Sequence, residues 1–293
     1  MEKSVDSVPN RKRNKRKGID GPVAQTIVWV LLIVEMFLVI SPLMITFSLS
    51  LKQPFEHTVG DIWALPANAQ WHYYGIAVKS ILPYVLNTLI VCVLTTLGVV
   101  LFSSITAYVF ARHNFIGKEV IFSLIIALMM VPSVLTMTPQ YLVVESFNLI
   151  NTRWALIIPG IAGGQVGAIM LFRTFFQQQP SSVFEAATID GANDVVMYAK
   201  LSLPLAVPVL IIQALGTFSL MYSDFLWPML VVKDDAIKTL MAVMTTLKGT
   251  SLVQKDPGIL YAMYLLSGVP LILVSLFGLK YAVSGDFTAG MKL

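Results

Sequence analysis

Long apolar blocks, separated by shorter polar segments, fill most of the chain beyond its first 26 residues. A helix of about 20 residues is needed to cross the hydrocarbon core of a bilayer. Six blocks reach that length: residues 27–51, 81–111, 120–144, 154–176, 204–232 and 259–283. Backbone groups in lipid have no water to bond, so each block must be helical. The pattern predicts an all-α, polytopic membrane protein with about six transmembrane helices.

Composition supports the same conclusion. Hydrophobic residues make up 56% of the chain and charged residues 12%, an apolar surplus that soluble domains of this length do not show. A single cysteine, Cys92, excludes an internal disulfide, and the three histidines have no ligand spacing, so we predict no metal site. Motifs for a nucleophile or a bound nucleotide are also missing, so we predict no catalytic residues and no cofactor bound by this chain.

The N-terminal segment carries six positive charges in seven residues, from Arg11 to Lys17. Such a cluster just before a first membrane helix keeps the N-terminus in the cytoplasm, and this reading is favoured over a nucleic-acid-binding arm. Six crossings then return the C-terminus to the cytoplasm. We therefore predict a basic cytoplasmic tail (1–26), a transmembrane domain (27–283) and a cytoplasmic C-terminal tail (284–293).

A polar segment lies between the fourth and fifth apolar blocks. Ser182, followed three residues later by Glu185, is a capping box that predicts the start of a short helix. Gly191 allows a sharp backbone turn, and Asn193 or Asp194 can cap a second helix. Residues 181–204 are therefore predicted to form a helix, a turn and a helix at the membrane surface.

This segment resembles the EAA loop of permease subunits from binding-protein-dependent ABC importers of the maltose and oligosaccharide class. The resemblance assigns contact with an ATPase to six residues: Glu185, Ala186, Ala187, Asp190, Gly191 and Ala192. Tyr198 stands where the family usually has Phe. Further similarity covers most of the chain: NTL at 87–89, LINTRWALIIP at 149–159, DFLWP at 224–228 and TAGMK at 288–292.

The resemblance implies a transport subunit and not an enzyme. It would form a path for a saccharide, either an oligosaccharide or a polysaccharide, and the chain also resembles permeases for long or acidic glycans such as alginate. The implied partners are a second, related permease chain, two ABC ATPases that bind ATP and Mg, an extracytoplasmic solute-binding protein and membrane lipid, with no nucleic acid. The implied location is the bacterial or archaeal cytoplasmic (inner) membrane.

Polar and aromatic side chains inside the apolar blocks are candidates for lining the path. The predicted set is Asn87, Gln140, Tyr141, Gln165, Tyr222, Asp224, Phe225 and Trp227. A carboxylate beside aromatic rings suits a sugar, whose hydroxyls accept or donate hydrogen bonds while its C–H face stacks on a ring. The alternative for residues 224–228 is an interfacial aromatic belt with a solvated acid. Gly160, Gly163, Gly164 and Gly167 predict close helix packing.

Other functions remain open from the residues alone. An ABC permease for amino acids or peptides also carries an EAA-like loop, whereas the segments at 224–228 and 288–292 favour the sugar class. An ion-coupled secondary transporter would use Glu35 and Asp224, the acidic residues set within these apolar blocks. A membrane-embedded enzyme would need a convergent set of catalytic residues, which the sequence does not contain.

Overall fold

The computed structural model describes residues 22–283, and this part of the chain is helical with no strand. Its α-helices are α1 (Pro22–Ser50), α2 (Pro54–Val59), α3 (His72–Arg112), α4 (Lys118–Ala127), α5 (Ser133–Ser146), α6 (Trp154–Gln178), α7 (Ser181–Ile189), α8 (Asp194–Met197), α9 (Leu203–Ser223), α10 (Leu226–Val231), α11 (Leu240–Thr246), α12 (Ser251–Lys255) and α13 (Pro257–Val283). The basic cluster at 11–17 and the segment at 288–292 lie outside the described residues.

The membrane-spanning pattern agrees with about six crossings. Within residues 22–283, five helices are long and apolar enough to span a bilayer: Ala24–Ser50, His72–Arg112, Trp154–Gln178, Asp194–Ser223 and Pro257–Tyr281. The number is six if one bent pair of helices counts as a single span. The all-α polytopic fold predicted from the apolar blocks is therefore confirmed.

The third predicted span, residues 120–144, is wrong as a single helix. It forms the pair Lys118–Met130 and Ser133–Ser146, whose axes are bent by 105°. Pro132 causes the break, because proline cannot donate to the helical ladder and forces the residue before it out of the helical region. Val131 accordingly has φ −84° and ψ 117°.

The fifth predicted span, residues 204–232, is also interrupted. Helix α9 ends at Ser223 and α10 starts at Leu226. The break lies at Asp224, whose backbone is extended and whose carboxylate accepts from the Leu226 and Trp227 amides at 3.1 and 3.4 Å. Pro228 does not cause the break: it lies in the first turn of α10, where a missing N–H is tolerated.

The second predicted span starts too late at residue 81. Helix α3 begins at His72 and has 41 residues, a length of about 60 Å at 1.5 Å per residue. Its first turns include Lys79 and Ser80, so hydropathy misses them. An apolar core about 30 Å thick covers only about half of this helix.

The chain divides into two units, with the boundary after Thr46. The described part of the first unit is most of α1, which exposes apolar side chains all round its axis, for example Trp29, Leu31 and Phe37. A helix that is hydrophobic on every side is typical of a membrane span. Glu35 is the acidic residue of this helix and is exposed.

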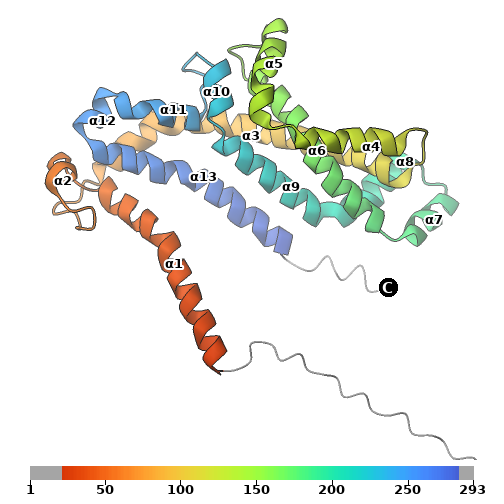
Figure 1. Cartoon of the computed structure of the whole chain (residues 1–293), viewed down its shortest axis with the longest axis horizontal. Coiled ribbons are helices and arrows are strands. Elements are labelled where there is room, and N and C mark those ends of the chain that lie inside the picture. Colours follow the sequence, from red (N-terminus) through yellow and green to blue (C-terminus); the bar gives the residue numbers. More distant parts are fainter. Residues whose placement is uncertain (1–21, 284–293) are drawn as a thin grey trace, which may run out of the picture. The chain divides into compact units, whose positions relative to one another are not determined.

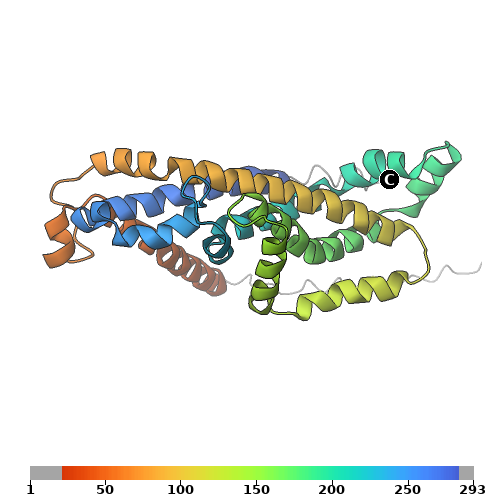
Figure 2. The same cartoon turned by 90° about the horizontal axis from the view of Figure 1, so that it is seen from above.

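The second unit is a bundle in which α3 packs against α6, α9 and α13 (Figure 1). Figure 2 shows α3 running along the bundle, with α4 beside its last part. Gly160 and Gly164 let α6 approach α3 closely, because an added Cβ would lie 2.9 Å from Thr95 Cγ2 and 2.6 Å from Val99 Cγ2. Gly163 and Gly167 have nothing within 4 Å of such a Cβ, so only half of the predicted glycine pattern packs inside the described chain.

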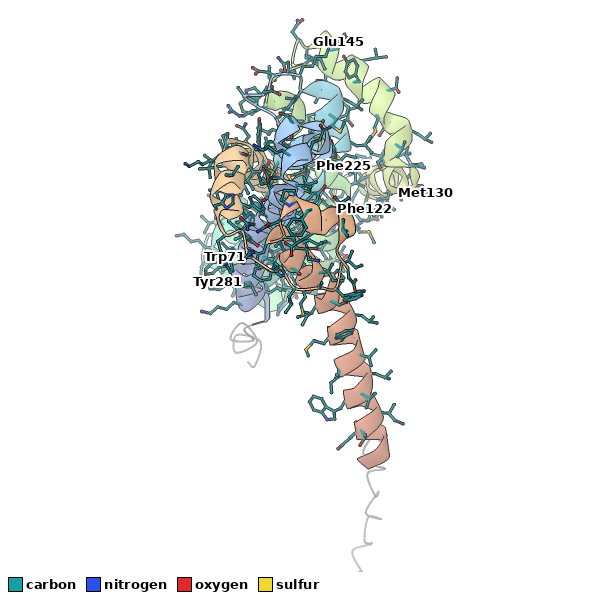
Figure 3. The ribbon with its side chains drawn as sticks, turned by 90° about the vertical axis from the view of Figure 1, so that its left-hand side faces the viewer. Trp71, Phe122, Met130, Glu145, Phe225 and Tyr281 are labelled. Carbon is teal, nitrogen blue, oxygen red and sulfur yellow. The ribbon has the colours of Figure 1, made fainter. Side chains whose placement is uncertain are left out.

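The bent pair is attached to the bundle mainly through α4. Arg173 on α6 is 8% exposed, donates to Glu119 at 2.7 Å and lies 3.7 Å from the Phe122 ring centroid. Helix α5 turns away from α4 and projects from the bundle, carrying Glu145 near its far end (Figures 1 and 3).

Candidate functional site: the coupling segment and the polar residues of the bundle

The polar segment between the fourth and fifth blocks folds into α7, a turn and α8, at the end of the bundle far from α12 (Figure 1). We call residues 181–202 the coupling segment. Phe184 is the buried residue of α7 and packs in a cluster with Tyr108, Phe172 and Phe176. Glu185, Ala186 and Asp190 are exposed, and Ala187 is partly exposed.

The predicted capping box is wrong. Helix α7 begins at Ser181 directly after Pro180, with no side-chain cap. Pro180 holds the preceding Gln179 in extended backbone, so α6 stops and α7 starts at the first residue after the proline. Ser182 is then inside the helix, where its hydroxyl cannot serve as an N-cap, and Glu185 is free to face outward.

The turn forms as predicted. Gly191 has φ +79°, a left-handed conformation that glycine adopts without strain. The Ala192 amide donates to the Ala187 carbonyl at 2.9 Å, which closes the turn. Asn193 caps α8, because its Oδ1 accepts from the Val196 amide at 2.9 Å.

The second helix of the segment differs from the prediction in its length. Helix α8 continues through a π-helical turn, Tyr198–Ser202, directly into α9, so residues 194–223 form one long helix. Tyr198, the departure from the usual Phe, forms a hydrogen bond with Ser104 on α3 at 2.8 Å. The coupling segment is therefore joined rigidly to a membrane span on one side.

The exposed surface of the segment mixes apolar and acidic groups. Val183, Ile189 and Val195 are 40%, 87% and 73% exposed. Glu185 and Asp190 lie among them. Such a surface suits a protein partner better than bulk water, because exposed apolar groups rimmed by polar ones mark interaction sites.

Asn87 lies at the centre of a second polar site, which we call the Asn87 knot. Its amide nitrogen donates to the carbonyls of Ala236 and Lys238 at 2.7 and 3.3 Å, and its Oδ1 accepts from Arg153 Nη2 at 2.7 Å. The neighbouring Thr88 hydroxyl accepts from the Leu240 amide at 2.8 Å. The knot holds the loop after α10 and the start of α6 against α3.

Tyr222 and Trp227 are also buried, at 1% and 7% exposed. The Tyr222 hydroxyl donates to the Ser267 carbonyl at 2.6 Å, and Trp227 Nε1 donates to the Ala155 carbonyl at 2.9 Å. The polar atoms of these two residues and of Asn87 are thus engaged inside the chain. The place of these residues along a path stays a prediction.

The remaining candidates are more accessible. Phe225 is 44% exposed, and Gln140, Tyr141, Gln165 and Asp224 are partly exposed. Gln165 Nε2 donates to the Ile161 carbonyl at 3.1 Å. Figure 3 shows Phe225 on the bundle, and Met130 and Glu145 on the bent pair of helices, part of which projects from it.

An open depression of about 460 Å³ lies beside the Asn87 knot. It is lined by Ile90, Leu94, Asn151, Thr152, Arg153, Trp154, Ile157, Asp234 and Ile237. None of the eight predicted path residues lines it. The predicted path residues therefore do not form this depression.

Sequence reasoning missed the residues that join the coupling segment to the bundle. Gln179, between α6 and α7, accepts hydrogen bonds from Arg112 at the end of α3 and from Ser202 in the π turn. The one available signal was a glutamine directly before a proline that separates two helices. That pattern does not reveal which of three successive glutamines points inward.

Comparison with known proteins decides the family. Residues 99–283 match the family described as binding-protein-dependent transport system inner membrane component. The chain belongs to this family. It is 32% identical to the probable ABC transporter permease protein PH1036 of Pyrococcus horikoshii over 80% of this chain and 86% of that protein. It is 30% identical to the diacetylchitobiose uptake system permease protein NgcG of Streptomyces coelicolor over 83% of this chain and 81% of that one.

A solved structure shares the fold. It is a chain in the crystal structure of a bacterial ABC transporter involved in the import of the acidic polysaccharide alginate, with a TM-score of 0.79 and 22% identity over 94% of this chain and 99% of that one. Membership of the family makes this protein a membrane-embedded subunit of a transport system that works with a binding protein.

Proposed function

We propose that this chain is the permease subunit of an ATP-driven importer and forms part of the path for a saccharide. The exposed coupling segment carries the proposal. It presents Glu185, Ile189 and Val195 at one end of the bundle, and its second helix continues without a break into the span ending at Ser223. A partner that moves this surface would move a membrane helix with it.

The proposed complex contains a second, related permease chain, two ATPases and an extracytoplasmic solute-binding protein. ATP and Mg bind to the ATPases, because this sequence carries no motif for a nucleotide. The coupling segment and both termini lie in the cytoplasm, an orientation supported by the basic cluster at 11–17. Closure of the ATPases shifts the membrane subunits between two global states.

A saccharide is the proposed cargo. NgcG is named for the uptake of diacetylchitobiose, and other relatives are named for trehalose, maltose and arabinooligosaccharides. The accessible candidates Gln140, Gln165, Asp224 and Phe225 supply neutral amides, one carboxylate and a ring face, which suit hydroxyl groups and a C–H face. The buried Asn87, Tyr222 and Trp227 would support the helices that carry these groups.

Purification and reconstitution test the proposal. The complex is extracted under mild conditions with its solute-binding protein, and the molecule held by that protein is identified. In vesicles we expect uptake of this saccharide to require hydrolysable ATP and to stop with a non-hydrolysable analogue. Uptake of an amino acid or peptide instead, or uptake driven by an ion gradient without ATP, would contradict the proposal.

A further inference from the structure

We propose that Arg112, Gln179 and Ser202 are positioning residues that hold the coupling segment in a fixed orientation on α3 and α9. Their role is to transmit movement of the segment to these helices. The inference rests on the proposed function, since it assumes that an ATPase moves the segment. It adds a mechanical link that lies behind the proposed ATPase-facing surface and outside the turn at residues 190–192.

Gln179 is the centre of the link. It lies between α6 and α7 and is 6% exposed. Its Oε1 accepts from the Ser202 hydroxyl at 2.7 Å and from Arg112 Nη2 at 3.2 Å, and its Nε2 donates to the Ser202 carbonyl at 3.0 Å. One amide therefore joins the entry to α7 with the π turn before α9 and with the end of α3.

Arg112 contacts both Gln179 and α7. Its Nη2 also donates to the Gln179 carbonyl at 3.2 Å, so the guanidinium contacts both the backbone and the side chain of this residue. Its Cζ lies 3.7 Å from the centroid of the Phe184 ring, a cation–π contact with the first turns of α7. The end of α3 thus contacts both α7 and the residue that leads into it.

Directional bonds make this link stiffer than apolar packing alone. A hydrogen bond weakens steeply when its angle or distance changes, whereas apolar surfaces slide past each other more easily. The protein also loses stability when the buried amide of Gln179 is left unpaired, so the network favours moving as one body over opening. The segment and the two helices should then shift together.

The three successive glutamines supply a matched test. Gln177 and Gln178 are exposed, whereas Gln179 is buried in the link. In the full reconstituted importer we compare Gln179→Ala with Gln178→Ala and measure saccharide molecules taken up per ATP hydrolysed. We expect this ratio to fall about two- to thirtyfold in Gln179→Ala, the range seen for residues that carry coupling between sites. Gln178→Ala should retain the wild-type ratio.

A structural readout separates the link from a general loss of stability. Spin labels at Asn114→Cys and Ile189→Cys, both exposed positions, report the distance between the end of α3 and the end of α7 in a Cys92→Ser background. Gln179→Ala should broaden this distance distribution and Gln178→Ala should not. If Gln179→Ala does not assemble, Ser202→Ala replaces it, because that change removes one hydroxyl and leaves the Arg112 contacts in place.

An unchanged uptake ratio together with an unchanged distance distribution in the assembled variant would overturn the inference. A wild-type importer that shows no ATP-dependent saccharide uptake would instead refute the proposed function. The two failures are therefore distinguishable in the same set of measurements.

Discussion

Two regions of the bundle each pair an arginine guanidinium with a buried side-chain amide, but the two pairs join different elements. In the Asn87 knot, Arg153 donates to the buried Asn87 side chain, whose nitrogen donates to two carbonyls of one loop. In the coupling link, Arg112 donates to a buried glutamine that reaches a second helix, and its guanidinium covers Phe184. The knot fixes a loop to the bundle, whereas the link joins three elements next to an exposed surface.

The comparison teaches that a buried amide is not by itself a sign of contact with substrate. Asn87 stood out in the sequence as a polar group inside an apolar block, yet its hydrogen bonds go to two backbone carbonyls and to the Arg153 side chain of the same chain. Gln179 did not stand out, because it lies among polar neighbours. What distinguishes the two sites is the element that the amide reaches: a loop for Asn87, and the π turn before α9 for Gln179.

The largest expected effect on stability is at the knot. Asn87→Ala removes the donor to the Ala236 and Lys238 carbonyls and leaves Arg153 without its amide partner. We expect a loss of about 3 kcal/mol, since each buried polar group left unpaired costs about 1 to 3 kcal/mol. Thermal unfolding of the purified protein in detergent measures this loss as a lower midpoint.

Asn114→Ala is the control, because Asn114 is exposed and its side chain accepts a long hydrogen bond, 3.3 Å, from Lys118 Nζ. It should leave the midpoint unchanged. If Asn87→Ala unfolds like the wild type but abolishes saccharide uptake, Asn87 acts on the path, as the sequence suggested, and the knot is not its main role.

A smaller effect is expected at the contact between Tyr198 and Ser104. The Ser104 hydroxyl also bonds to the Leu101 carbonyl at 3.0 Å, so it keeps a partner when the phenol is lost. Tyr198→Phe, which restores the residue usual in the family, should cost about 1 kcal/mol or less in unfolding free energy. A loss above about 2 kcal/mol would contradict this expectation and would mean that the bond between Tyr198 and Ser104 stabilises the protein more than an ordinary hydrogen bond does.

Local signals predicted much of the architecture. Apolar length located most spans, and the special geometry of Gly191 and the cap at Asn193 followed from residue type alone. The spacing of four singled out Gly160 and Gly164, which lie on the face of α6 that meets α3, but it also singled out Gly163 and Gly167, which have no neighbour within 4 Å of an added Cβ. These features depend on neighbours within a few residues, so a single sequence contains the information.

Features set by competing or distant groups were not predictable. The predicted capping box at Ser182 does not form, because Pro180 makes the helix begin at Ser181. The fifth predicted span is broken at Asp224, whose carboxylate accepts from two free amides, and not at the proline four residues later. The partners of Asn87 lie about 150 residues away, at Ala236 and Lys238, and no local pattern indicates such a pairing.

The most direct test of the coupling segment compares two glycines. Gly191 and Gly117 have φ values of +79° and +82°, and neither has an atom within 4 Å of an added Cβ. Valine at either position therefore strains the backbone by a similar amount, about 1 to 2 kcal/mol or more. Only Gly191 lies in the coupling segment; Gly117 precedes α4.

The measurement is ATP hydrolysis stimulated by loaded binding protein in the reconstituted complex, for Gly191→Val and Gly117→Val at matched levels of assembly. We expect Gly191→Val to lose most of the stimulation and Gly117→Val to keep it. Full stimulation in Gly191→Val, or an equal loss in both variants, would contradict the claim that the segment between α6 and α9 couples the ATPase to the membrane helices.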